Sequence, residues 1–294
     1  MCVIFNPAAR GDKARRWRAQ LNRLRAEAAL RPTARPGAAR HLAAQAVREG
    51  FDVVVAAGGD GTINEVLNGL GDTPDGFARA RLGILPLGTT NVLARELGLP
   101  RSLPRAWEAI LAGRERRLDL PWAEWHETAG PERRYFAQMA GAGLDARAIE
   151  AVSWPLKKCL GQLAYVVAGL RALNRPAPSI TLAGDHRSEV GELVLLGNGR
   201  FYGGPFRLFP SADPTDGLLD VCVFPRAGWL TVLRCAPGLL LRRQLPTGPV
   251  RRLRMSRLTL SSPEAVPFEL DGELAGRLPV TFGLLPRTLR VAVP

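Results

Sequence analysis

One stretch of this chain, Phe51–Leu70, constrains the fold more than any other, because it reads as a strand, a glycine loop and a helix in direct succession. Val53–Ala57 is a short apolar run rich in β-branched residues, which is typical of a strand buried in a parallel sheet. The loop Gly58–Gly61 allows tight turning, and the following helix start offers N–H groups and a positive dipole end. The stretch therefore predicts a cradle for phosphate. The apolar face of the helix consists of Ile63, Val66, Leu67 and Leu70.

The polar residues of this loop separate it from better-known phosphate loops. No lysine follows the glycines, and Asn64 stands where a dinucleotide loop has its third glycine. Thr62 and Glu65 form a capping-box pattern, which predicts Thr62 as the N-cap of the helix. Asp60 would repel phosphate unless it binds a metal ion or a proton. A plain strand-to-helix turn with Asp60 as a turn residue is the alternative.

The same strand–loop–helix pattern occurs three times in the first part of the chain. Cys2–Phe5 precedes Asn6-Pro7, and Leu82–Leu85 precedes the loop Gly88–Asn91. Right-handed crossovers make such strands parallel and bring their following loops to one edge of the sheet, where ligands of open α/β sheets bind. The helices expected around this sheet are a basic one carrying Trp17, Leu21 and Leu24, and others at about 38–49, 92–97 and 104–113, with a connection at 31–37.

From about Leu118 the chain changes to short strand-like segments separated by turns, which is typical of an antiparallel β domain. Two helical stretches interrupt it, Leu156–Leu173 and a leucine- and arginine-rich stretch within Trp229–Leu245. Each either covers a sheet or lies on a membrane surface with its basic residues toward lipid headgroups. The expected strands are 118–125, 134–141, 179–183, 189–197, 219–224, 256–260, 266–270 and 278–283.

The net charge of +13 comes from 37 arginines and three lysines against 27 acidic residues. This excess favours an anionic partner, such as nucleic acid, an anionic membrane surface or a phosphorylated substrate, unless it is only compositional bias. The four cysteines form no Cys-x-x-Cys pair, and the three histidines are isolated, so zinc, redox and hydrolase sites have little support. The N-terminus lacks the pattern of a signal peptide and no run suits a membrane span, so we expect a cytoplasmic protein.

Two acidic spots lie in the second half. Asp213, Asp216 and Asp220 occupy one turn, and carboxylate oxygens are the ligands that Mg²⁺ prefers, although surface turns are also often acidic. Asp271-Gly272 ends an expected strand, and such a pair also makes an ordinary hairpin turn.

Taken in order, the motifs of this chain resemble the diacylglycerol kinase catalytic-domain family, which includes bacterial soluble lipid kinases and sphingosine kinases. The Gly-Gly-Asp-Gly-Thr core alone is shared with NAD kinases and phosphofructokinases, whereas the full series is more specific. The resemblance covers nearly the whole chain. Its matching motifs are Asn6-Pro7, Gly58–Glu65, Gly88–Asn91, Gly141–Ala146, Gly161–Tyr165, Asn198-Gly199, Tyr202–Gly204, Asp216-Gly217 and Leu270–Glu273.

The resemblance implies a phosphofructokinase-like α/β domain over residues 1–117, a β-sandwich domain over 118–276, and a tail, 277–294, that returns to the first domain. It implies an ATP-dependent lipid kinase with Mg²⁺, whose active site lies in the cleft between the domains. Asp271 would be the general base, Asp60 a metal contact or second carboxylate, and Asp213, Asp216 and the Leu218 carbonyl the metal ligands. The nucleotide contacts carried over are Asn6, Thr33, Gly58, Gly59, Asp60, Gly61, Thr62, Ile63, Asn64, Glu65, Gly88 and Thr89.

The chain departs from the family pattern in three places. Val92 stands where many members have Asp, Leu144 replaces a Phe, and Ala8–Gly11 lacks the usual Ser-Gly pair. The alternatives are a kinase of a soluble acceptor such as NAD, and a nucleotide-binding protein without catalysis. A nucleic-acid-binding protein rests on charge alone, and no binding motif supports it. We expect a lipid substrate, transient contact with the inner face of the membrane and no nucleic-acid partner. The sequence leaves open both a monomer and a homodimer, and it does not identify the lipid.

Overall fold

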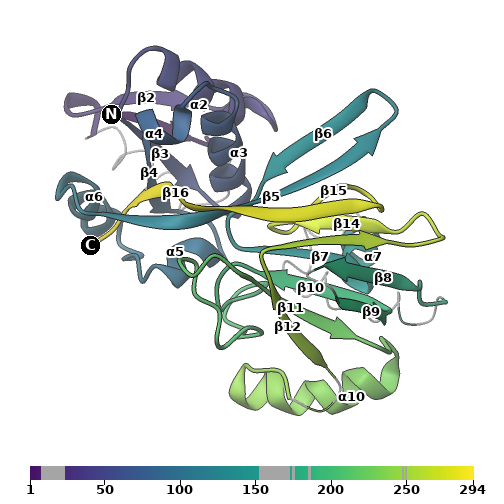
Figure 1. Cartoon of the computed structure of the whole chain (residues 1–294). Coiled ribbons are helices and arrows are strands. Elements are labelled where there is room, and N and C mark those ends of the chain that lie inside the picture. The colour runs from purple at the N-terminus through teal and green to yellow at the C-terminus, as the bar shows by residue number, and fades with distance from the viewer. Residues whose placement is uncertain (8–23, 152–172, 174–175, 185–186, 247, 249) are drawn as a thin grey trace. The chain divides into compact units, whose positions relative to one another are not determined.

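The structure is a computed structural model that describes residues 1–7, 24–151, 173, 176–184, 187–246, 248 and 250–294 (Figure 1). The chain forms two compact units, Met1–Leu120 with Leu285–Pro294, and Pro121–Leu284. The first is an α/β unit and the second a β-sandwich, so the predicted fold class is confirmed. The sequence placed the boundaries after residues 117 and 276.

The sheet of the first unit is parallel and has the order β2-β1-β3-β4. Phe5 lies opposite both Pro32 and Ala57, and Gly58 lies opposite Pro86, so the strands end together at one edge of the sheet. Beyond β4, Val291 of β16 lies parallel to Leu82. The strands are β1 (Cys2–Phe5), β2 (Ala29–Pro32), β3 (Val53–Gly58), β4 (Arg81–Pro86) and the last part of β16 (Val280–Ala292).

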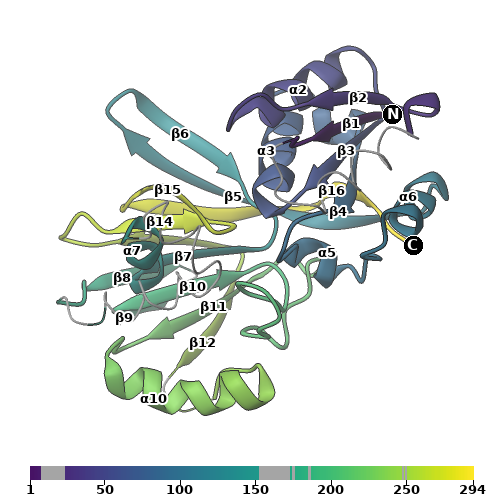
Figure 2. The ribbon, with the colours of Figure 1, turned by 180° about the vertical axis from the view of Figure 1, so that it is seen from behind.

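Helices cover both faces of this sheet. Val3 and Val55 pack with Trp107 and Ile110 of α6 (Leu103–Leu111) in one buried cluster. Side chains alternate along a strand, so Ile4, Val54 and Ala56 point to the opposite face, and α2 and α3 contact the strands there (Figures 1 and 2). A Cβ at Gly69 would overlap the Arg40 carbonyl, so glycine allows these two helices to pack closely. The remaining helices are η1 (Leu24–Ala26), α2 (Ala38–Arg48), α3 (Asp60–Gly71), α4 (Gly76–Arg79) and α5 (Val92–Glu96).

The second unit contains two antiparallel sheets around one apolar core. The aromatic side chains of Trp125, Phe136, Phe268 and Phe282 meet edge to face there, with ring centroids 5.1–6.1 Å apart. One sheet has the order β12 (Arg251–Met255), β11 (Leu219–Phe224), β10 (Leu193–Gly197), β7 (Met139–Gly143), β14 (Pro267–Leu270) and β15 (Glu273–Arg277). The other contains the first part of β16, β13 (Arg257–Ser261), β8 (Ile180–Gly184) and β9 (Arg187–Gly191), beside the hairpin of β5 (Glu115–Glu127) and β6 (Gly130–Tyr135).

The described helices of the second unit are α7 (Leu144–Ala151), α10 (Trp229–Pro237) and the π-helical turn η2 (Gly238–Arg242). Figure 2 shows α10 beside the ends of β11 and β12, on the outside of the sheet. None of the described helices is long and apolar enough to cross a membrane. The predicted helices around Trp17 and over Leu156–Leu173 lie outside the described residues, apart from Leu24 in η1 and Leu173.

Most predicted strands exist, and two, Cys2–Phe5 and Leu219–Phe224, have the predicted bounds. The connection expected at 31–37 is partly wrong, because Arg31 and Pro32 belong to the edge strand β2. The arginine-rich strand β12 was also missed. An edge strand that faces solvent needs few apolar residues, so its sequence carries a weak strand pattern.

Candidate nucleotide and acceptor sites

Backbone hydrogen bonds join two of the three loops that the sequence placed at one sheet edge, those after β3 and β4. The N–H groups of Leu87 and Gly88 both donate to the Gly58 carbonyl at 3.0 Å. On the other side, Thr33 N–H donates to the Phe5 carbonyl at 2.9 Å, which holds the residue after β2 against the end of β1. The carboxyl edge therefore gathers the predicted loops, as parallel strands require.

Two glycines allow the loops after β3 and β4 to approach each other. A Cβ built on Gly88 would overlap the Cα of Gly59, whereas one built on Gly59 would lie 3.5 Å from the Cα of Gly88, in ordinary contact. A Cβ on Gly58 would lie 2.6 Å from the Thr62 Cβ. Gly88 and Gly58 are thus required by close packing, and the backbone around Gly59 stays open to a ligand.

The helix α3 begins earlier than predicted. Its N-cap is Gly59, without a side-chain cap, so the proposed capping box of Thr62 and Glu65 is wrong. Glu65 instead accepts hydrogen bonds from Gly37 N–H (2.8 Å) and Ala39 N–H (2.9 Å), and so caps the neighbouring helix α2. The helix starts at Asp60, after an extended Gly59, and this places Glu65 beyond the first turn.

Asp60 holds the two glycine loops together. Its carboxylate accepts the N–H groups of Asn91 (2.9 Å) and Val92 (2.6 Å), which begin helix α5. A carboxylate at a helix N-terminus is favoured by the helix dipole. The contact explains why a phosphate loop can contain this aspartate. The sequence did not predict the contact.

The sequence indicates Asn91 only as the last residue of the Gly88–Asn91 motif, whereas in the structure its side chain holds this loop. It has a positive φ of 50° and is 7% exposed, and its Nδ2 donates to the Gly88 carbonyl at 2.7 Å. Its buried Oδ1 has no hydrogen-bond partner among the described residues. An asparagine tolerates the left-handed conformation, which is the signal that could have identified it.

The other predicted nucleotide contacts lie along α3 and the loops. Gly61 and Thr62 occupy the first turn of α3, whose N–H groups have no intrahelical acceptor. Ile63 is different, because its N–H donates to the Gly59 carbonyl at 3.1 Å and its side chain is buried. Asn64 is half-buried and accepts a hydrogen bond from Asn68, whereas Thr89 and Asn6 are exposed.

Asp271 lies in the two-residue turn between β14 and β15, where Asp271 and Gly272 have φ values of 50° and 88°. Its carboxylate accepts three consecutive N–H groups, from Ala137 (2.7 Å), Gln138 (2.9 Å) and Met139 (3.1 Å). The residue is 9% exposed. The Asp-Gly pair thus makes the expected hairpin turn, and the carboxylate is also fixed against the start of β7.

A second buried carboxylate, Glu269, lies two residues before Asp271 and was missed. It is 1% exposed, and its two oxygens accept the Tyr202 hydroxyl at 2.7 Å and the Gly272 N–H at 2.6 Å. Because Glu269 holds the glycine of the same turn, it positions the backbone that carries Asp271. Its place on a predicted strand gave no signal beyond a charged residue in an apolar segment.

The predicted metal ligands lie in the turn before β11. Asp213 Oδ1 accepts the N–H (3.0 Å) and hydroxyl (2.7 Å) of Thr215, and Asp216 Oδ1 accepts Leu218 N–H (3.0 Å). Asp216 also pairs with Arg254 through Oδ2. These are oxygen donors of the kind that Mg²⁺ prefers, but no described group of three acidic, His or Cys side chains is arranged to hold a metal.

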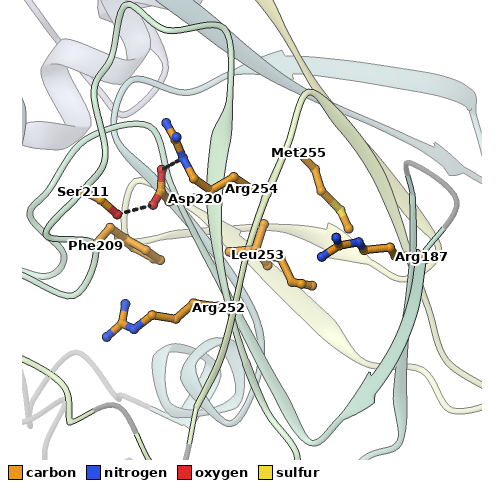
Figure 3. Close-up of a pocket in the computed structure, with 9 residues that line it drawn as sticks. Arg187, Phe209, Ser211, Asp220, Arg252, Leu253, Arg254 and Met255 are labelled. Carbon is orange, nitrogen blue, oxygen red and sulfur yellow. Dashed lines mark hydrogen bonds and ion pairs between the residues drawn. The ribbon is translucent and has the colours of Figure 1, made fainter.

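Arg254 links this turn to a cavity of about 500 Å³ on the β11–β12 face (Figure 3). Figure 3 shows Arg252 and Arg254 on the side of Asp220, and Arg187 on the side of Met255. Asp220 accepts Ser211 Oγ–H at 3.2 Å and Arg254 Nε–H at 3.3 Å. Burial raises the pKa of the Asp220 carboxyl, and Arg254 opposes that rise.

The sheet edge of the first unit and the hairpin turn of the second unit offer different chemistry. Open backbone N–H groups at a helix start bind phosphate oxygens. A fixed carboxylate can orient a hydroxyl and accept its proton. For a metal ion, Asp213, Asp216 and the Leu218 carbonyl fit in ligand type, provided that Arg254 releases Asp216.

Comparison with known proteins confirms the resemblance carried by the motifs. The family described as "Diacylglycerol kinase catalytic domain" matches residues 1–122, and "YegS C-terminal NAD kinase beta sandwich-like domain" matches residues 138–293. The protein named diacylglycerol kinase in Bacillus subtilis (strain 168) is 31% identical over 302 residues, which cover 99% of this chain and 95% of that relative.

Two solved structures share the fold. One is a diacylglycerol kinase from Bacillus anthracis str. Sterne, with a TM-score of 0.73, 19% identity, and coverage of 100% of this chain and 96% of that chain. The other is yeast NADH kinase complexed with NADH, with a TM-score of 0.55, 11% identity, and coverage of 100% and 84%. At these identities the likeness concerns the fold alone.

Proposed function

This chain belongs to the diacylglycerol kinase family of lipid kinases, and on that premise we propose that it transfers the γ-phosphoryl group of ATP to the hydroxyl of a lipid alcohol such as diacylglycerol. In this reaction the hydroxyl oxygen forms a bond to the γ-phosphorus, the bond from that phosphorus to the β–γ bridging oxygen breaks, and ADP leaves. The hydroxyl proton passes to a base of the protein.

The observation that carries the proposal is the glycine-built edge of the first unit. The close approach of Gly88 to Gly59 exposes backbone rather than side chains at the start of α3. Backbone N–H groups at that helix start would receive the ATP phosphates, and the Asp60 bridge to Asn91 and Val92 would keep the two loops in register. Positioning of this kind supplies much of the catalysis in phosphoryl transfer.

Asp271 is the proposed base. Three N–H donors fix the position of its carboxylate. Because the transition state of phosphoryl transfer is loose, little proton transfer is needed early, and a carboxylate that orients the hydroxyl need not be strongly basic. Asp60 is already engaged with α5, so we assign it to holding the loops.

Magnesium, when bound, would neutralise charge on the protein or the phosphates. Asp213, Asp216 and the Leu218 carbonyl are the proposed ligands, and the ion would compete with Arg254 for Asp216. This competition makes the site testable without turnover. Mg²⁺ should raise the melting temperature of Arg254→Gln more than that of the natural protein, and it should not raise that of Asp216→Asn.

An acceptor panel tests the function. The purified protein is incubated with ATP, Mg²⁺ and lipid alcohols in mixed micelles, and in parallel with NAD and with sugars, and products are detected by mass spectrometry. We expect a phosphorylated lipid and no soluble phosphorylated product. Phosphorylation of NAD would favour the second candidate, which the yeast NADH kinase fold supports. ATP binding without any product would favour a non-catalytic nucleotide-binding protein.

A further inference from the structure

The helical segment Trp229–Arg242, which consists of α10 and η2, turns its apolar side away from the protein. Five of its large apolar side chains are exposed, by 49% to 83%. The two helical pieces are continuous, because Gly238 between them has helical backbone angles. We call the set of exposed residues the outer apolar face; it consists of Trp229, Leu230, Leu233, Leu240 and Leu241.

The helical spacing shows that these residues form one stripe. Trp229 and Leu233 are four residues apart, and Leu240 and Leu241 follow after two further turns, so all lie on one side. Cys235 lies on the opposite side and is only 5% exposed. The helix therefore packs through the side of Cys235, where Val232 and Leu239 are half-buried, and leaves a second apolar side uncovered.

The surroundings of the outer apolar face are basic. Arg226, Arg234, Arg242 and Arg243 are all exposed, and Arg226 is paired with Glu192 at 3.0 Å. The stretch from Val221 to Pro263 contains eight arginines and no acidic residue, and two of these arginines, Arg251 and Arg254 of β12, pair with carboxylates from outside the stretch. The helix has a leucine stripe, arginines beside that stripe and a tryptophan at its first position. This is the composition of a helix that lies in the interface of an anionic bilayer.

We propose that α10 and η2 dock this protein on an anionic lipid bilayer, with the leucines among the acyl chains and the arginines at the headgroups. The charge pattern favours this occupant over a second copy of the chain, because two such faces would bring like charges together. It also favours lipid over nucleic acid, which would contact the arginines and leave the leucines in water. The biological need for docking rests on the proposed function, since a lipid alcohol resides in a bilayer.

Vesicle co-sedimentation tests the proposal. Vesicles of phosphatidylcholine with about 30% phosphatidylglycerol should bind the protein in a salt-sensitive manner, and vesicles of phosphatidylcholine alone should bind it weakly. Leu240→Ser with Leu241→Ser should weaken binding at least about tenfold, because two exposed leucines no longer enter the acyl region. Arg242→Gln with Arg243→Gln should weaken binding to the anionic vesicles about tenfold and remove most of the salt dependence.

Matched controls come from exposed apolar residues elsewhere. Leu111→Ser and Val190→Ser, at positions 48% and 52% exposed, should bind as the natural protein does. Brominated lipids should quench tryptophan fluorescence on binding, and Trp229→Phe should remove most of the quenching. Circular dichroism and unfolding midpoints show whether each variant is folded.

Three results would overturn the proposal: folded leucine variants that bind anionic vesicles normally, a leucine variant that only converts a dimer to a monomer, or salt-sensitive binding to DNA in place of vesicles. A short-chain lipid alcohol dispersed below its critical micelle concentration separates this proposal from the kinase. If that acceptor is phosphorylated and the α10 variants bind vesicles as the natural protein does, the docking proposal is wrong and the proposed kinase function is supported. If α10 directs vesicle binding and no acceptor is phosphorylated, the function fails and docking stands.

Discussion

The carboxylates of Asp60 and Asp271 are held by the same kind of contact, but the segments that donate to them differ. Both carboxylates accept backbone N–H groups, two for Asp60 and three for Asp271. The donors to Asp60 open helix α5, so that carboxylate stabilises neighbouring loops of one sheet edge. The donors to Asp271 lie just before and at the start of β7, more than 130 residues earlier in the chain.

The turn at Asp271 shows why the aspartate itself matters. Its left-handed backbone would accept asparagine or glycine equally well, so the turn alone does not require a carboxylate. The hydrogen bonds do, because an amide has only one acceptor oxygen. The comparison teaches that a carboxylate bound by the backbone can be structural, catalytic or both, and that variants must be judged by turnover and stability together.

The largest expected effect is that of Asp271→Asn. We expect kcat to fall about a hundredfold to ten-thousandfold, because the base is lost, while ATP affinity changes little. The unfolding free energy should also fall by about 1–3 kcal/mol, because one N–H then faces an amide NH₂ group. Steady-state kinetics with a urea titration measure both. An unchanged kcat in the folded variant would remove Asp271 from catalysis.

Gly88→Ala tests the loop edge by steric overlap. Its Cβ would meet the Gly59 Cα, so the loops must separate, and we expect ATP affinity to fall about tenfold and stability to fall by about 1–3 kcal/mol. Gly59→Ala is the control for stability, because its Cβ reaches only ordinary contact at 3.5 Å. Calorimetric ATP titration and thermal unfolding report the two effects. Equal stabilities for the two variants would contradict the packing of these loops.

Asp60→Asn should have a smaller effect, and one mainly on stability. It weakens one of two hydrogen bonds to the start of α5 and removes a charge that the helix dipole favours, which is worth about 1 kcal/mol. Turnover per folded molecule should fall less than about tenfold, because Asp60 only positions the loops. A loss of kcat as large as that of Asp271→Asn would show that Asp60 takes part in the chemistry.

The smallest expected change in stability is at the Glu115–Arg290 pair, which lies outside both loops. It shows how much an ion pair on the surface contributes. The hydrogen bond from Arg290 lowers the pKa of Glu115 below its usual 4.5. The pair therefore adds stability above that pH, and the stability is lost as the pH falls through the lowered value. Arg290→Gln should destabilise the protein by less than about 1 kcal/mol at pH 7. The difference should shrink in acid to what the hydrogen bond from Arg290 to the Ala78 carbonyl contributes, whereas Arg117→Gln should change little at either pH.

The sequence predicted the loop edge well because strand polarity determines it. A parallel strand followed by a polar loop leaves few arrangements, so the sequence alone places Gly58–Thr62 and Gly88–Asn91 at the same sheet edge. Strand polarity does not predict which groups the side chains of these loops hydrogen-bond to. The capping box of Thr62 and Glu65 was wrong because the helix begins at Asp60 and the N–H groups at the start of α2 donate to Glu65 instead.

The second unit was harder to predict at the level of its site. Glu269 bonds to Tyr202, which is distant in sequence. Arg254 pairs with Asp216 and Asp220, which are also distant in sequence. No local pattern encodes such pairs, since each depends on strand register. The outward leucines of α10 were visible as an amphipathic stretch, but which side faces the protein is decided by tertiary packing.

The most direct test of the account is a single turnover of γ-labelled ATP with lipid acceptor and an excess of protein. The natural protein should transfer the label from ATP into the lipid extract, and Asp60→Asn should do so more slowly. Asp271→Asn should bind ATP and leave the label there. Label appearing in lipid at equal rates with Asp271→Asn and the natural protein, or never appearing in lipid although ATP is bound, would contradict the account.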